Sequence, residues 1–179
     1  MKRIIIPLIL FLFLVLEGVA LELLPVSLAK SDLVIVPHWV FVFLLLLTIF
    51  YDRENTYFSV LYGLLFGLLI DIVYTGVLGV YMFSYALVIY IIHGLTKMLH
   101  ANFFVSLLLG MIGLILCEVF INAIYTVVGI SDMIWKDYLI YRMAPTVIAN
   151  IVFLAALYPI MLKKLSSWRN EQLSTNTTF

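Results

Sequence analysis

Apolar residues occupy most of the chain in long runs, and polar residues interrupt these runs at only a few points. A transmembrane helix needs roughly 20 mostly apolar residues. At ~1.5 Å per residue, the run over residues 57–96 is about twice as long as a hydrocarbon core is thick. It must therefore turn, and the glycines within residues 75–79 favour a turn there. The pattern predicts six transmembrane helices, over residues 4–24, 33–50, 57–75, 77–96, 103–128 and 139–162.

These helices predict an all-α fold, a polytopic membrane bundle in a single domain over residues 1–165. The remaining residues, 166–179, are polar, and we expect a disordered cytoplasmic tail there. Composition agrees with this class, because 65% of the 179 residues are hydrophobic and only 11% are charged. Soluble domains are about half apolar and about a quarter charged. A water-soluble fold is therefore excluded.

Positive charges in the short loops predict the orientation. If the N-terminus is cytoplasmic, seven of the ten Lys and Arg residues lie on that side: Lys2, Arg3, Arg53, Lys97, Lys163, Lys164 and Arg169. The other side then carries Lys30, Lys136 and Arg142. We therefore expect both termini in the cytoplasm. The first apolar run is too long for a signal peptide and carries Glu17 and Glu22, which argues against cleavage after residues 27–29.

Four ionisable side chains fall inside predicted spans, where they are costly and often functional. They are Glu17, Asp71, Glu118 and Arg142. Polar or small residues also recur every four positions, which places them on one helix face. The three stripes are Gly63, Gly67 and Asp71; Glu118, Asn122 and Thr126; and Arg142, Thr146 and Asn150. Gly63 and Gly67 form a small-xxx-small pattern that allows another backbone to approach closely.

Depth in the membrane predicts how the stripes meet. Asp71 and Arg142 lie at similar distances from the outer ends of their helices, and Glu118 and Asn150 both lie near the midplane. We therefore expect an Asp71–Arg142 ion pair, for which Glu17 competes, and a Glu118–Asn150 contact. Without a donor or cation, Glu118 should be neutral. These groups are more often internal glue between helices than an ion path or a partner contact.

The chain shows no motif for chemistry. It has no Walker A loop, no GxSxG, no HExxH and no Cys pair, since Cys117 is its single cysteine. Asp71 and Glu118 lie on different helices at different depths and do not form an acid/base dyad by spacing. His93 and His100 are weak as a metal site. We expect no enzyme, no cofactor and no metal, and the zero net charge excludes a nucleic-acid footprint.

One segment is distinctive. Residues 63–71 read GLLFGLLID, and Leu78 and Gly79 follow before an aromatic-rich helix. This resembles the Gly-x-x-x-Gly-Leu-Leu-x-Asp segment and later Leu-Gly of the rod shape-determining protein MreD family. The length, the Lys-Arg start, the six spans and the basic tail also fit, so the similarity covers the whole chain.

The resemblance implies a non-enzymatic scaffold of the cell-elongation machinery in the bacterial plasma membrane. Its implied partners are an MreC-like single-span protein, the MreB filament directly or indirectly, wall synthases of the RodA and penicillin-binding types, and membrane lipids. The small-residue faces would bind the MreC span. Asp71 with Gly63, Gly67 and Gly79 would form the functional core.

Two other functions stay open. The family's fold is similar to the substrate-binding subunits of energy-coupling-factor transporters, so the chain could bind a vitamin in an outer-leaflet pocket. Those subunits dock through small residues on the first helix, often Ala-x-x-x-Ala, and here only Gly18 and Ala20 are small. The third hypothesis is a small ion or proton-coupled carrier that uses Asp71 and Glu118.

Overall fold

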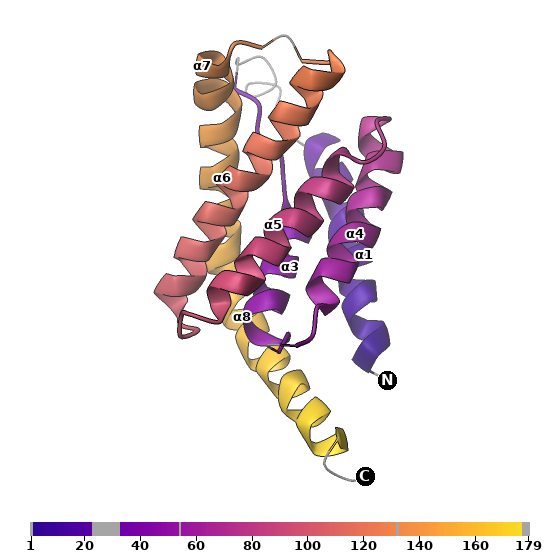
Figure 1. Cartoon of the computed structure of the whole chain (residues 1–179), viewed down its shortest axis with the longest axis vertical. Helices are drawn as coiled ribbons and strands as arrows, with labels where there is room; N and C mark the ends of the chain where they lie inside the picture. The colour runs from indigo at the N-terminus through magenta and orange to yellow at the C-terminus, as the bar shows by residue number, and fades with distance from the viewer. Residues whose placement is uncertain (1, 23–32, 54, 132, 177–179) are drawn as a thin grey trace.

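The computed structural model describes residues 2–22, 33–53, 55–131 and 133–176 (Figure 1). All regular structure in these residues is helical, and it forms six apolar helical segments. In chain order they are α1 (Lys2–Glu22); α3 (Trp39–Phe50); α4 (Phe58–Ile70), continued by the π-helix η1 (Asp71–Thr75); α5 (Val80–Thr96); α6 (Phe103–Val128); and α7 (Trp135–Tyr138), continued by the π-helix η2 (Leu139–Met143) and α8 (Ala144–Asn176).

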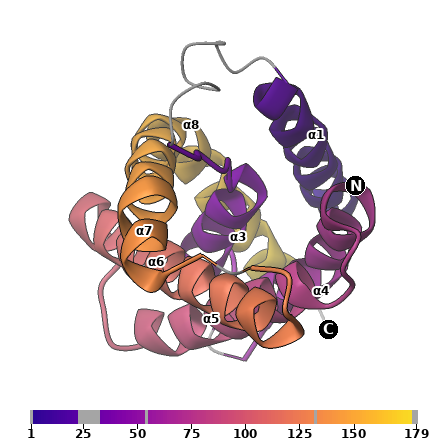
Figure 2. The same ribbon diagram turned by 90° about the horizontal axis from the view of Figure 1, so that it is seen from above.

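Helix α3 forms the centre of the bundle. Its residues 40–50 are all buried, as expected for a helix that is apolar on every side. It contacts α1, α4, α5, α6 and α8, and Figure 2 shows these helices arranged around it. The surrounding helices pack on α3 and on one another, most extensively α4 on α5.

Three segments are long and apolar enough to cross a membrane, namely Phe58–Thr75, Phe103–Val128 and Trp135–Trp168. Three further apolar helices are shorter: Ile4–Ala20, Trp39–Phe50 and Val80–Thr96. The outward side chains of these helices include many large apolar residues, such as Leu8 on α1 and Val152 on α8. Outward apolar faces around a buried core are the construction of a helical membrane protein.

Two expected boundaries differ most from the structure. Residues 33–38 are not helical, because Pro37 has no N–H to donate and disfavours helix in the residue before it. We refer to this non-helical stretch as the extended segment; it ends at His38, which has φ −114° and ψ 48°. At the other end, α8 continues to Asn176 through the tail that we expected to be disordered. Buried Leu165 ties this extension to the core, and each further residue then adds one backbone hydrogen bond.

Candidate functional site

Asp71 lies where α4 passes into η1, and it is fully buried. Its Oδ2 accepts hydrogen bonds from the backbone N–H groups of Gly79 at 2.9 Å and Met82 at 3.1 Å, and its Oδ1 accepts one from Tyr81 at 2.9 Å. The first N–H groups of a helix have no partner within the helix, and its N-terminus favours negative charge. Asp71 therefore caps α5 from the preceding helix.

Glycines allow this cap to form. Gly79 precedes α5 with a φ of +100°, a conformation that side chains other than glycine rarely adopt. At Gly67, a Cβ atom would lie 2.6 Å from the Cα of Met82, and at Gly63 it would lie 3.4 Å from the Cα of Ala86. The glycine face of α4 is thus filled by α5 of the same chain and is not free for a partner helix.

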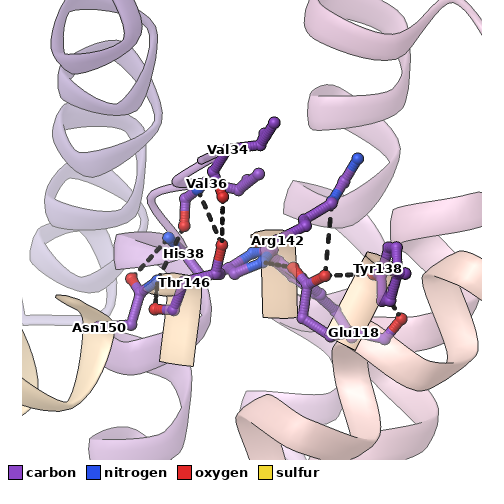
Figure 3. A network of polar contacts seen from close by, with 9 residues as sticks. Val34, Val36, His38, Glu118, Tyr138, Arg142, Thr146 and Asn150 are labelled. Carbon is purple, nitrogen blue, oxygen red and sulfur yellow. Dashed lines mark hydrogen bonds and ion pairs between the residues drawn. The ribbon is translucent and has the colours of Figure 1, made fainter. Parts of the chain in front are cut away.

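A second polar cluster forms where the extended segment 33–38 lies along α8 (Figure 3). Thr146 Oγ1 accepts from Val36 N–H at 3.1 Å and donates to the Val34 carbonyl at 3.3 Å. Asn150 Oδ1 accepts from His38 N–H at 2.7 Å, and its Nδ2 donates to the Val36 carbonyl at 2.8 Å. Extended backbone inside a membrane needs such partners, and the polar stripe of α8 supplies them.

The spacing of this contact explains its register. Two residues of extended chain rise ~6.6 Å, and four residues of α-helix rise ~6 Å. Alternate residues of the extended segment therefore have nearly the same spacing as residues four apart on the helix. About one turn before Thr146, the Tyr141 carbonyl accepts from Val34 N–H at 2.8 Å. This bond extends the row of contacts between the extended segment and the last helix, which we refer to as the ladder.

His38 joins this ladder to Glu118. The two ring nitrogens of His38 lie 2.7 Å from Glu118 Oε1 and 2.8 Å from the Tyr85 hydroxyl. The tautomer with its proton on Nε2 donates to Glu118 and accepts from Tyr85, so both ring nitrogens are satisfied. The Tyr138 hydroxyl donates to Glu118 Oε2, and Arg142 Nε lies 3.6 Å from that oxygen. The buried Glu118 carboxylate thus has the His38 ring and the Tyr138 hydroxyl as donors and the Arg142 guanidinium as a nearby cation.

Both predicted pairings are wrong. Arg142 pairs with Glu118 and not with Asp71, whose oxygens are occupied by backbone N–H groups of α5. Asn150 bonds the backbone of His38, while Glu118 bonds its ring, so one residue of the extended segment separates the two expected partners. Depth along ideal helices misled the prediction, because neither the extended segment nor the π-helices were anticipated.

The donors at Glu118 also change its expected state. We expected a neutral carboxyl only if no donor or cation reached it. His38, Tyr138 and Arg142 all reach it, so that condition does not hold. Sequence reasoning missed His38, although Pro37 before it was a sign that the predicted helix starts later.

Glu17 has a structural partner as well. Its Oε1 accepts from Val40 N–H at 2.8 Å, in the first turn of α3. The three buried carboxylates described inside the bundle, Glu17, Asp71 and Glu118, thus all accept hydrogen bonds from other elements. Asp71 and Glu118 share no hydrogen-bond partner among the described residues.

The charged loop after α3 is also partly internal. Asp52 is buried, and its Oδ2 accepts from both the hydroxyl and the backbone N–H of Ser59, the latter at 3.0 Å. It therefore caps α4. Burial raises the pKa of Asp52 above its ordinary range, although the bonds from Ser59 act in the opposite direction.

Next to the polar clusters lies a half-open cavity of about 450 Å³. Its walls come from α1, the extended segment, the end of α4, η1, α5, α6, η2 and the start of the loop after α6. Asn122, which was predicted to share a stripe with Glu118, lies in its wall together with Glu17 and Arg142. Glu118 itself faces His38 instead.

Comparison with known proteins gives one consistent result. The profile of the family described as rod shape-determining protein MreD matches residues 2–167. The rod shape-determining protein MreD of Bacillus subtilis (strain 168) is 29% identical over 151 residues, which cover 84% of this chain and 86% of that protein. No solved structure matches the chain significantly.

Proposed function

The chain belongs to the MreD family of rod shape-determining proteins, and on that premise we propose that it is a non-enzymatic membrane scaffold. In this proposal it holds an MreC-like single-span protein in the cell-elongation machinery. Through that protein, and directly or indirectly through the MreB filament, it organises side-wall peptidoglycan synthesis by RodA-type and penicillin-binding-type enzymes.

The proposed topology has six crossings with both termini in the cytoplasm. The distribution of Lys and Arg supports it, and so do the lengths of the segments. Helix α3 has 12 residues, or about 18 Å at ~1.5 Å per residue. The extended segment before it adds about 20 Å at ~3.3 Å per residue. Together they exceed the ~30 Å of a hydrocarbon core, so the second crossing would be half extended chain and half helix.

The observation that carries the scaffold proposal is the use of the buried carboxylates. Glu17 caps α3, Asp71 caps α5 and Glu118 holds His38. A carrier needs acidic groups that exchange partners during transport, whereas these groups each fasten one element to another. Such cross-links stiffen a bundle, and a rigid bundle is what a scaffold requires.

The partner must then bind an outward face, because α5 fills the glycine face of α4. Helix α1 contacts α3 and α4, and Leu8, Leu12 and Val15 point away from them with more than a third of their surface exposed. A single transmembrane helix can pack along such a face through van der Waals contact.

A site-specific crosslinking experiment tests the proposal. A photo-crosslinking amino acid replaces Leu12 on α1, Leu65 on α4 or Val152 on α8, which are all exposed. Each full-length variant is expressed in cells as the only copy, irradiated, solubilised and captured. Cells that keep their rod shape show that the variant functions, and unirradiated cells provide the background.

The proposal expects an MreC-like single-span protein to be crosslinked at one of the three faces and not at the others. Wall synthases should be recovered with it. Capture of ATP-binding subunits with their membrane coupling protein would contradict the scaffold and favour the vitamin-transport alternative. Recovery of no protein of the elongation machinery from functional variants would also contradict it.

A further inference from the structure

The half-open cavity of about 450 Å³ has a distinct chemical character. Tyr74, Tyr81 and Tyr125 line it together with Asn122 and Arg142, so the lining has three aromatic rings, one amide and one guanidinium. Its volume lies in the range of small-molecule sites, which are mostly apolar with a few polar groups that orient the ligand.

The carboxylates around this cavity are already occupied. Glu17, in the wall, accepts from Val40 N–H. Glu118, next to Arg142, accepts from His38 at one oxygen and from Tyr138 at the other. These acids therefore offer little to a ligand that carries donors.

Two nitrogen atoms of the amide and the guanidinium in the lining, in contrast, make no hydrogen bond among the described residues, although the Arg142 guanidinium is attracted by Glu118 and lies 5.6 Å from the centre of the Tyr138 ring. Asn122 is only 2% exposed, and its Nδ2 has no hydrogen-bond partner among the described residues. The same holds for Arg142 Nε, which lies 3.6 Å from Glu118, close enough for charge attraction but too far for a hydrogen bond. A buried donor without a partner is costly, so two of them in one cavity wall point to a missing acceptor.

We propose that this cavity binds an acidic group, a carboxylate or a phosphate, through Asn122 and Arg142. A guanidinium has the planar geometry and charge that these anions prefer. The tyrosine rings would hold the part of the ligand next to the acid. The inference does not depend on the scaffold role.

The acidic group can come from a lipid headgroup or from a free small acid. Pro37 lines both this cavity and a second, mostly apolar one of about 380 Å³. Ala20, Val152 and Phe153 line this second cavity, which lies between α1 and α8. A lipid with its headgroup in the first cavity would have apolar space close by, so the experiment must separate the two sources.

Calorimetric titration of the purified full-length protein in a neutral detergent makes the test. The probes are dioctanoylphosphatidic acid, inorganic phosphate and dioctanoylglycerol, which has the same chains without an acidic group. Asn122→Asp replaces the amide donor by a carboxylate of the same size. Arg142→Gln removes the cation, and Arg142→Lys keeps the charge without the planar fork. Arg53→Gln, in the loop after α3, is the control for loss of a positive charge elsewhere.

We expect an acidic probe to bind at one site. Asn122→Asp and Arg142→Gln should each weaken it roughly tenfold or more, Arg142→Lys should weaken it less, and Arg53→Gln should leave it unchanged. Binding of phosphate alone would identify a free acid as the ligand class. Binding of dioctanoylphosphatidic acid without phosphate would identify a lipid headgroup.

Three results would overturn the proposal. They are no binding of either acidic probe, equal binding of dioctanoylglycerol, and unchanged affinity in both Asn122→Asp and Arg142→Gln. Unfolding temperature is measured for every variant. If Arg142→Gln unfolds early because Glu118 loses its cation, Asn122→Asp alone decides the outcome.

Discussion

Replacement of Asp71 by Ala should weaken the bundle more than the loss of an ordinary helix cap. The substitution removes two oxygens that together accept three backbone N–H groups, from Gly79 just before α5 and from Tyr81 and Met82 in its first turn, at 2.9, 2.9 and 3.1 Å. Asp71 is fully buried, so water cannot replace these bonds at little cost. The contact between α4 and α5 is among the most extensive in the bundle, and it would lose its polar anchor.

The magnitude follows from hydrogen bonds measured inside membrane proteins. These average ~0.6 kcal/mol and reach ~1.7 kcal/mol. Three such bonds give a loss of roughly 2–5 kcal/mol in the free energy of unfolding. The charge of Asp71 at a helix N-terminus favours the upper part of this range.

Asn102 provides a matched control at another helix. Its Oδ1 accepts one N–H, from Val105 at 2.8 Å, and the site is exposed. Asn102→Ala should therefore cost about 1 kcal/mol, the usual value for an N-cap. Unfolding of the purified full-length protein in mild detergent, followed by near-UV circular dichroism against denaturant, measures both losses. Asp71→Ala should lose at least twice as much stability as Asn102→Ala.

An Asp71→Ala variant that is no more destabilised than Asn102→Ala would contradict this role of Asp71. The conservative variant Asp71→Asn separates structure from function, because it keeps one acceptor oxygen and the size of the side chain. If it accumulates to the normal level and cells still lose rod shape, Asp71 has a specific role beyond packing. Loss of the protein itself would support a structural role.

Three further predictions use the same unfolding assay. Gly67→Ala should lower the free energy of unfolding by about 1–3 kcal/mol, the usual cost of overpacking, because its Cβ would lie 2.6 Å from the Cα of Met82. The control Gly94→Ala has nothing within 4 Å of its Cβ, so it should be neutral or stabilising by up to about 1 kcal/mol. Equal effects of the two substitutions would contradict the close approach of α4 and α5. Asn150→Leu should lower the free energy of unfolding by roughly 1–3 kcal/mol, because the His38 N–H loses its acceptor and the Val36 carbonyl loses its donor. A neutral effect would mean that other contacts hold the extended segment. Because burial raises the pKa of Asp52, the folded protein keeps this proton more tightly than the unfolded chain. The stabilisation from Asp52 should therefore be greatest below about pH 4 and be lost as pH rises through the raised pKa. The free energy of unfolding of wild type should then depend on pH differently from that of Asp52→Asn, and identical pH dependence of the two proteins would contradict the prediction.

Much of the fold follows from patterns that are local in sequence. The long apolar runs predict where helices lie, and the glycines before α5 mark a turn that the structure places between η1 and α5. Gly63, Gly67 and Asp71 were expected on one face of a helix, and all three face α5. These features depend on the helix period and on the backbone freedom of glycine, and both can be read from residues close together in the sequence.

The partners of the polar groups could not be predicted in the same way. The pairing of Asp71 with Arg142 assumed that charges at equal depth meet. In the structure, the backbone of α5 satisfies Asp71 first, because the π-helix η1 and the short turn after it bring these N–H groups within 3.1 Å. A side-chain pattern contains no information on where unpaired backbone groups will lie, so a helix terminus can take the place of the expected cation.

The surface that binds a partner helix is equally hard to recognise from the sequence pattern. Small and polar residues on one helix face suggest a binding site for another helix, but here both kinds of face are used within the chain. Gly67 receives α5, and Thr146 and Asn150 receive the extended segment that Pro37 keeps out of the helical conformation. The faces that remain for a partner are plain apolar ones, such as that of Leu12 on α1, and apolar surface alone does not distinguish a partner from lipid. Shape and the few polar groups near the helix ends must then select the partner, which is why crosslinking at several faces is more informative than substitution of the glycines.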